Sequence, residues 1–306
     1  MPGLAVEQRR APRAAEDLAV FAAPGIFVVL WASGFIGAKL GLPYAEPLTF
    51  LWLRMMGAVL LLGIIILLTR PQMPSRAETL HSAATGLLVH GLYLGGVYVA
   101  IWNGLPAALS ALVVGLQPLL TSTIANRWLG ERVMPRQWLG LALGLLGVYL
   151  VVRDRASAGE ATPFAWAASA VALIGITVGT LYQKRFGGGI DWRPAMGIQY
   201  AAAGILFFLG AATFEAGYVR LTAAFLFALG WLVFVLSLGG IWLFYFLIRR
   251  AAATRVVSLF YLTPPVTALM AWALFGEHLA LPALAGMAVC VAGVFLVNWR
   301  AGGARA

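Results

Sequence analysis

Long apolar runs separated by short polar breaks dominate this sequence. Residues 47–69, for example, carry a single charged side chain, that of Arg54. A helix needs about 20 residues to cross the roughly 30 Å hydrocarbon core of a bilayer, and continuous apolar runs differ from the alternating pattern of membrane β-strands. The pattern predicts ten transmembrane helices, at residues 19–41, 46–69, 79–102, 105–127, 136–152, 164–184, 194–214, 222–247, 253–275 and 281–299.

The composition supports the same fold class. A hydrophobic content of 62% and a charged content of 10% leave too little polar surface for a water-soluble globule. We therefore expect an all-α integral membrane protein with lipid as its surroundings. The net charge of +10 lies in the short breaks, where basic residues act as topology signals, so nucleic acid is not an expected partner. The single cysteine, Cys290, predicts neither a disulfide nor a metal site, and no cofactor is expected.

The basic residues predict the orientation of the chain. With ten helices and a cytoplasmic N-terminus, sixteen of the 21 Lys and Arg residues fall on the cytoplasmic side. Four fall on the opposite side, and Arg54 lies within a helix. This asymmetry predicts a multi-pass protein of a bacterial-type plasma (inner) membrane, with both termini in the cytoplasm. Losing or adding one helix would remove the asymmetry.

One sequence motif occurs twice. The stretch PLLTSTIANRWLGE begins at Pro118, and PPVTALMAWALFGE begins at Pro264, 146 residues later. Five predicted helices separate the copies, so they should run in opposite directions across the membrane. The same offset matches Gly140, Gly147 and Val151 with later counterparts, namely Gly286, Gly293 and Val297. We therefore predict two inverted five-helix repeats, as in many transporters. The predicted domains are a cytoplasmic tail (1–18), the first repeat (19–152), an external linker (153–163), the second repeat (164–299) and a cytoplasmic tail (300–306).

The duplicated motif, the ten-helix plan and the early stretch LWASGFIGAK resemble the EamA-type carriers of the drug/metabolite transporter superfamily. The resemblance covers residues 19–300. Within that family, the region around Trp31 and LTFLWLR, which ends at Arg54, is most similar to bacterial exporters of aromatic and other neutral amino acids, of the YddG type. The resemblance implies a secondary exporter that works by alternating access at a midplane cavity, not an enzyme.

Ionisable side chains inside the predicted helices are the first candidates for substrate binding, because they are costly in lipid. His90 lies near the middle of its helix, with Tyr93 and Val97 on the same face by helical spacing. We favour a substrate contact for His90 over a packing role and over a proton relay. Arg54 could hold a substrate carboxylate, or it could extend to the headgroups, and we favour the latter. For Lys39, at a helix end, we also expect contact with the headgroups.

Other candidates come from proline and aromatic residues. Three prolines remove backbone donors inside predicted helices, which predicts hinges or, alternatively, static kinks, namely Pro118, Pro264 and Pro265. Aromatic and polar residues on several helices should line a cavity for neutral or aromatic substrates. Besides His90 and Tyr93, the predicted substrate-binding residues are Trp31, Ser33, Gln117, Tyr182, Tyr245, Tyr261 and Thr263.

No Asp or Glu lies deep in a predicted helix, so the carboxylate that many proton antiporters use is missing from the sequence. We therefore predict facilitative or weakly coupled export by a protein that acts as a monomer. The alternatives are a nucleotide-sugar or organophosphate exchanger of the same superfamily, which should carry more cations, and an integral-membrane transferase, which should cluster His, Asp, Glu or Cys near one interface. A channel is disfavoured because no charged or carbonyl-lined filter is evident.

Overall fold

Helices make up the whole regular structure of the described chain. The computed structural model describes residues 11–105, 107–153, 161–276 and 280–299, and no strand forms within these ranges. This confirms the predicted all-α membrane protein. Residues 1–10 of the N-terminal tail, most of the predicted linker, the C-terminal tail and Glu277 of the second motif lie outside the described residues.

The helices follow the predicted segments closely. In the first half they are α1 (Ala11–Gly41), the short η1 (Leu42–Tyr44), α2 (Pro47–Thr69), α3 (Arg76–Gly86), η2 (Leu87–Leu92), α4 (Tyr93–Trp102), α5 (Ala107–Val114), α6 (Gln117–Trp128) and α7 (Pro135–Val152). In the second half they are α8 (Pro163–Phe186), α9 (Trp192–Phe214), α10 (Ala223–Gly230), η4 (Trp231–Gly240), α11 (Ile241–Arg250), α12 (Ala253–Ser258), η5 (Leu259–Leu262), α13 (Thr263–Phe275) and α14 (Leu281–Asn298).

Nine segments of the described chain are long and apolar enough to cross a membrane. The fourth predicted helix is the exception, because a turn at Gly115 and Leu116 divides it into α5 and α6, and each part is too short by itself. Three of the nine spanning segments consist of two α-helices joined by a turn of another kind. In two of them π-helical turns, η2 and η4, join α3 to α4 and α10 to α11, and in the third a 3₁₀ turn, η5, joins α12 to α13.

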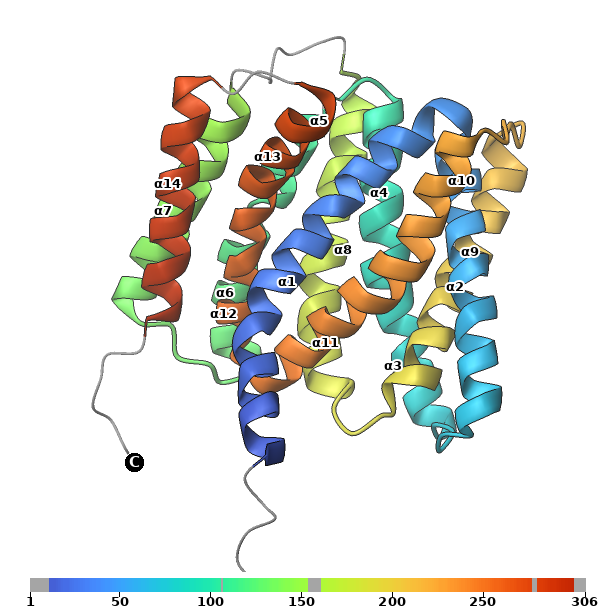
Figure 1. Cartoon of the computed structure of the whole chain (residues 1–306), viewed down its shortest axis with the longest axis horizontal. Coiled ribbons are helices and arrows are strands. Elements are labelled where there is room, and N and C mark those ends of the chain that lie inside the picture. Colours follow the sequence, from blue (N-terminus) through green and yellow to red (C-terminus); the bar gives the residue numbers. More distant parts are fainter. Residues whose placement is uncertain (1–10, 106, 154–160, 277–279, 300–306) are drawn as a thin grey trace, which may run out of the picture.

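Equivalent helices in the two halves of the chain make equivalent contacts. The last helices of the halves, α7 and α14, lie side by side, as do the second helices, α2 and α9 (Figure 1). The first helix, α1, contacts η4 and α13, and its counterpart α8 contacts η2 together with α5 and α6. Exchanging the halves therefore leaves the α7–α14 and α2–α9 contacts unchanged and converts the contacts of α1 into those of α8.

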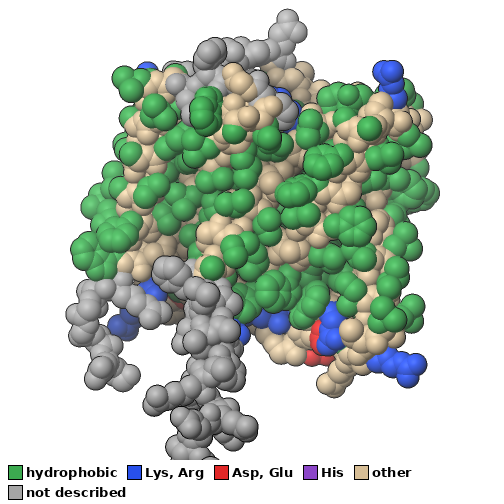
Figure 2. Space-filling view, viewed as in Figure 1, with side chains coloured by type: hydrophobic (Ala, Val, Ile, Leu, Met, Phe, Trp, Pro, Cys, Tyr) green, Lys and Arg blue, Asp and Glu red, His purple; other side chains and the backbone are tan. Residues whose placement is uncertain are grey.

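The two ends of the bundle differ in the number of basic residues that they carry. Helix α1 begins and α14 ends at the lower end in Figure 1. We name this the arginine-rich end, since it carries Arg70, Arg76, Arg127, Arg132, Arg136, Lys184, Arg185, Arg193, Arg249, Arg250 and Arg255. The opposite end, which we name the Lys39 end, carries Lys39, Arg153 and Arg220 among the described residues. Between them, Figure 2 shows a broad surface of hydrophobic side chains, as expected for a lipid-facing wall.

The glycines of the duplicated motif end helices at opposite ends of the bundle. Gly130 follows α6 with a φ of 69°, and Gly276 follows α13 with a φ of 67°. Glycine is the residue that adopts this left-handed conformation without strain, and it commonly terminates helices for that reason. The first copy lies at the arginine-rich end and the second at the Lys39 end, which explains why basic residues follow only the first.

The glycines that match at the offset of 146 form the contact between α7 and α14. A Cβ atom added at Gly140 would lie 2.6 Å from the carbonyl oxygen of Gly293. One added at Gly147 would lie 2.6 Å from the backbone nitrogen of Cys290 and 2.7 Å from the oxygen of Gly286. Small residues allow helix backbones to approach closely in membranes. These matched glycines therefore allow the close packing of α7 against α14.

An ion pair at the arginine-rich end gives a pH-dependent prediction. The Asp191 carboxylate caps the start of α9 through the Arg193 backbone N–H at 3.0 Å and accepts two bonds from the Arg193 side chain, at 2.9 and 2.5 Å. The Arg193 side chain holds the pKa of the Asp191 carboxyl below its usual value. This stabilisation is complete above the pKa of an unfolded aspartate, about 3.9, and is lost as the pH falls through the lower folded pKa.

Asparagine can still cap the helix, so replacing Asp191 with Asn removes only the charge of a partly exposed pair and should lower stability by less than about 1 kcal/mol near neutral pH. Thermal unfolding of the detergent-solubilised protein, followed between pH 7 and pH 3, measures the difference. We expect the stability difference between the wild type and Asp191→Asn to narrow as the pH falls below about 3.9. A gap that stays constant with pH would show that the ion pair contributes nothing.

Candidate functional site

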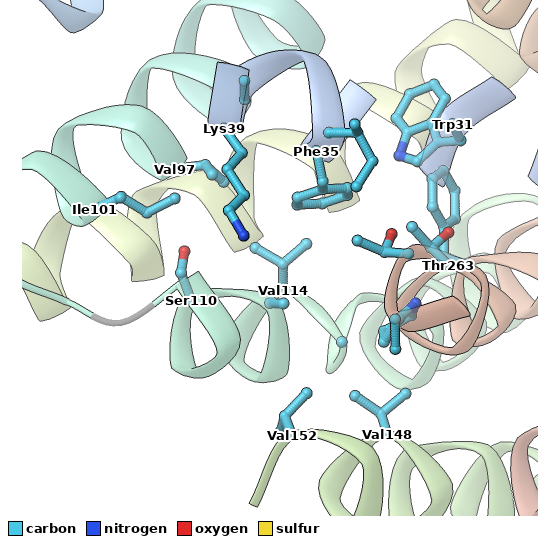
Figure 3. Close-up of a pocket in the computed structure, with 18 of the residues that line it drawn as sticks. Trp31, Phe35, Lys39, Val97, Ile101, Ser110, Val114, Val148, Val152 and Thr263 are labelled. Atoms are coloured by element: carbon cyan, nitrogen blue, oxygen red, sulfur yellow. The ribbon is translucent and has the colours of Figure 1, made fainter. Parts of the chain in front are cut away.

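A cavity of about 560 Å³ runs from the middle of the bundle toward the Lys39 end. Its walls come from α1, α4, α5, α7, η5 and α13, and it is not enclosed (Figure 3). Residues in the last turns of three helices, Lys39, Ile101 and Val152, line it together with Ala271, near the end of α13. We call this cavity the chamber. Its lining shows that the chamber reaches the Lys39 end of the bundle.

The chamber is mainly apolar. Valine, alanine, isoleucine and aromatic side chains make up most of its surface, and no Asp or Glu is among the described residues that line it. Apart from the aromatic residues Trp31 and Tyr93, the polar side chains are few, namely Lys39, Ser110, Thr263 and Thr267. The Thr263 hydroxyl is buried without a hydrogen-bond partner, so it is available to a molecule in the chamber. An apolar pocket with a few polar groups is typical of small-molecule sites.

Aromatic rings close the chamber toward the middle of the bundle. Trp31 and Phe260 line the chamber, with ring centroids 5.0 Å apart. Two fully buried rings pack behind them, because Phe27 lies 5.5 Å from Phe260 and Phe244 lies 5.7 Å from Trp31. Such edge and tilted contacts stabilise aromatic clusters beyond their burial. These four residues therefore form a packed floor, which we call the aromatic floor.

Two helix breaks border the chamber at related positions. The turn between α5 and α6 contains Gly115, and the 3₁₀ turn η5 leads into Thr263 and Pro264 at the start of α13; all three residues line the chamber. Adding 146 to 115 gives 261, within η5. Pro118 and Pro264 lie in the first turns of α6 and α13, where a missing N–H is tolerated. Discontinuous helices of this kind mark binding sites in transporters.

A small recess of about 50 Å³ lies beside the chamber. It shares the walls formed by Trp31, Phe35, Tyr93 and Val97 with the chamber, and it contains Arg54 and His90. We call it the Arg54 recess. Arg54 is 3% exposed and its Nε donates to the Ser237 hydroxyl at 3.1 Å, so the expected extension to the headgroups is wrong. His90, Tyr93 and Val97 share this wall, as their spacing predicted.

An ion pair joins several helices at the arginine-rich end. Lys184 of α8 lies 3.2 Å from a carboxylate oxygen of Glu131, in the loop after α6. The same Glu131 oxygen accepts the backbone N–H of Ala253 at 2.9 Å, and Lys184 donates to the carbonyl oxygens of Ile248 and Ala251. Three separate parts of the bundle, the α6–α7 loop, α8 and the α11–α12 junction, are therefore joined at this end.

The structure brings some of the predicted site residues together. Trp31, Tyr93, Thr263 and Pro264 line the chamber, while Arg54 and His90 lie in the adjoining recess. The remaining predicted residues lie outside both linings and contact other groups or pack inside the bundle; they are Ser33, Gln117, Pro118, Tyr182, Tyr245, Tyr261 and Pro265.

Several of these outlying residues have identified partners. Ser33 accepts a hydrogen bond from Trp231 Nε1, and Gln117 donates to Thr180. Tyr182 shares a 2.7 Å bond with His81 toward the arginine-rich end, and Tyr245 donates to Gln199. Tyr261 packs against Gly144, at which a Cβ would lie 2.2 Å from the Tyr261 ring. Their roles in binding stay predictions.

Other lining residues were not among the predicted site. Val148, Val151 and Val152 of α7 and Val114 of α5 form one wall, and no sequence signal separates them from valines that pack or face lipid. Lys39 was expected at the headgroups, yet its side chain lines the chamber (Figure 3).

Comparison with known proteins agrees with this fold. A crystal structure of a protein 19% identical matches with a TM-score of 0.75 over 90% of this chain and 95% of that one, which supports the fold. Among curated relatives, the uncharacterized transporter YvbV of Bacillus subtilis is 28% identical over 89% of both chains. A "probable amino-acid metabolite efflux pump" of Escherichia coli is 24% identical, with 90% of this chain and 94% of that one covered.

A third relative is the "probable terminal-alkyne amino-acid exporter" of Streptantibioticus cattleyicolor, which is 27% identical, with 91% of this chain and 93% of that one covered. The EamA-like transporter family matches residues 20–153 and, a second time, residues 162–299. Together these two matches include almost all of the described helices. The chain belongs to the EamA-like transporter family.

Proposed function

We propose that this transporter exports small neutral metabolites, in particular amino acids including aromatic ones, by alternating access. The observation that carries the proposal is the chamber, which is apolar, has no described acid in its lining and is closed by aromatic rings on one side. Such walls suit an uncharged side chain or a ring. The relatives named as an amino-acid metabolite efflux pump and an amino-acid exporter support the same substrate class.

The proposed mechanism uses two inverted halves, residues 19–152 and 164–299. The contact pattern between halves supports this relation, because exchanging them maps α1–η4 and α1–α13 onto α8–η2 and α8 with α5 and α6. Rocking of similar halves about a central site can expose that site to each side in turn. The arginine-rich end is proposed to face the cytoplasm of a bacterial-type inner membrane, so the chamber faces outward in this conformation.

Each group around the chamber receives a proposed role. The rings of Trp31 and Tyr93 would hold an apolar side chain or an ammonium group, and the unpaired Thr263 hydroxyl would hydrogen-bond a polar group. Pro264 would mark the hinge between η5 and α13. The outlying predicted residues would act in another conformation, in which the helices around the aromatic floor have moved.

The proposed transport is driven by the substrate gradient. The described acids, among them Glu46, Glu131, Asp191 and Glu215, lie at helix ends or in loops, and none lines the chamber or the recess. A coupled proton antiporter needs a group that exchanges protons within the pathway. His90 is proposed to bind substrate and not to relay protons.

Flux in proteoliposomes tests the proposal. We expect purified protein to exchange radiolabelled phenylalanine with saturable kinetics, and to do so with no pH gradient across the membrane. Empty liposomes are the control for leakage. Strict dependence on an imposed pH gradient would disprove gradient-driven exchange, and transport restricted to phosphate esters would favour the organophosphate exchanger instead.

A further inference from the structure

Arg54 is a buried cation whose location calls for an explanation. It lies on α2, seven residues after Pro47, and 3% of its surface is exposed. Its Nε donates to the Ser237 hydroxyl and its side chain also bonds the Tyr98 hydroxyl, but no carboxylate is among the described residues that line the recess. A buried charge without an opposite charge is strongly destabilising in a membrane. Such a cost is retained where the charge serves a ligand.

The residues around Arg54 are held in place by a short chain of contacts. The Ser237 backbone carbonyl oxygen accepts the Tyr200 hydroxyl at 2.5 Å, and the Tyr200 ring lies 4.6 Å from the His90 ring. Ser237 belongs to η4 and His90 to η2, so both neighbours of the recess lie on π-helical turns. Such turns are frequent at functional sites because they shift the side chains that follow them.

His90 supplies a second, independent sign of a missing ligand. Its side chain is 1% exposed and lines the recess, where it also contacts the Gln199 side chain. Its Nε2 atom has no hydrogen-bond partner among the described residues. Buried polar atoms nearly always have a partner in a folded protein. A guanidinium and an unpaired imidazole nitrogen therefore share one small space, which opens beside the chamber at Trp31 and Tyr93.

We propose that the Arg54 recess binds the carboxylate of the transported substrate, which makes zwitterionic α-amino acids the substrate class. The inference rests on the proposed function. A recess of about 50 Å³ has room for a carboxylate. The guanidinium donates to both carboxylate oxygens, and His90 Nε2–H donates to one of them.

The rest of the amino acid then lies in the chamber. The α-ammonium group is next to the shared wall, where the Trp31 and Tyr93 rings hold it by cation–π contacts. The side chain extends between the apolar walls, which accept aromatic and aliphatic groups alike. Amines and amides that lack the carboxylate leave Arg54 uncompensated and bind weakly. This division gives specificity for the amino-acid backbone and tolerance toward the side chain.

The test compares phenylalanine with phenylalaninamide, which has the same ring and ammonium group but no carboxylate. Binding to the full-length protein is followed by ligand-induced thermal stabilisation, and transport by competition for phenylalanine exchange. We expect the wild type to bind phenylalanine at least about tenfold more tightly than the amide. Arg54→Gln should lose this preference by weakening the binding of phenylalanine and leaving that of the amide unchanged.

A second variant keeps the test decisive if Arg54→Gln does not fold. His90→Gln removes the imidazole donor and should reduce the preference for the acid about fivefold. Arg76→Gln, an exposed residue at the arginine-rich end, is the matched control for the lost charge and should keep the full preference. A wild type that binds acid and amide equally overturns the inference, as does a preference that survives in both recess variants. Failure to bind or exchange any neutral amino acid would instead overturn the proposed function.

Discussion

Replacing Gly147 by Ala is expected to prevent the accumulation of folded protein. The added Cβ would lie 2.6 Å from the backbone nitrogen of Cys290 and 2.7 Å from the carbonyl oxygen of Gly286. Both neighbours are backbone atoms, so no rotamer change can relieve the overlap. The two helices would have to separate along their length, and we expect a loss of more than about 3 kcal/mol, at the upper end of the overpacking range.

Size-exclusion chromatography and thermal unfolding in detergent measure this effect. Gly63→Ala is the matched control, because Gly63 lies within helix α2 and a Cβ there meets no atom within 4 Å. The control should fold normally, since alanine favours a helix over glycine. If Gly147→Ala were as stable and as monodisperse as Gly63→Ala, the close contact between α7 and α14 would be wrong.

The helical plan could be predicted from the sequence because bilayer thickness fixes the length of each apolar run. The predicted helix at 46–69 is observed as Pro47–Thr69, and the one at 281–299 as Leu281–Asn298. The division of the fourth helix was not predicted. Pro118 indicated a break in this helix. The turn lies at Gly115 and Leu116, before the proline, because the first turn of α6 accommodates Pro118.

The site could be predicted only where a residue type is rare inside a membrane. Arg54, His90 and the aromatic residues Trp31 and Tyr93 stand out in apolar helices, and the structure places all four around the recess. We expected the Arg54 side chain to extend to the headgroups, and this was wrong. The position of a residue in the sequence gives its depth along a helix, but it does not show which other helices pack around it. Residues such as Tyr182 and Gln117 are equally conspicuous in the sequence, but they point toward partners in adjacent helices.

Replacing Lys184 by Met is expected to open the chamber to the arginine-rich end. Lys184 pairs with Glu131 and also binds carbonyl oxygens at the end of α11, while Glu131 accepts the first N–H of α12. The two side chains are 20% and 14% exposed, so water screens the pair less than a surface pair. Removing it should cost about 1.4 kcal/mol of the closed state, which corresponds to a tenfold change in population.

A cysteine in the chamber reports this change. Thr267 lines the chamber, and Cys290 is the single cysteine of the chain, so Thr267→Cys is combined with Cys290→Ala. A membrane-impermeant maleimide, applied to inside-out vesicles, should label the Lys184→Met variant about tenfold faster than its parent. Labelling from the Lys39 end should be fast in the parent, because the chamber already reaches that end.

Arg193→Met is the control for a general loss of positive charge at the arginine-rich end, because it leaves the Glu131–Lys184 pair intact. It removes the ion pair with Asp191, which joins residues two positions apart and connects no separate helices. Labelling from the arginine-rich end should therefore stay at the parent rate in this control. Equal rates in Lys184→Met and its parent would mean that the aromatic floor alone closes the pathway. The rings of Trp31, Phe27, Phe244 and Phe260 would then be the elements that must separate for substrate to enter.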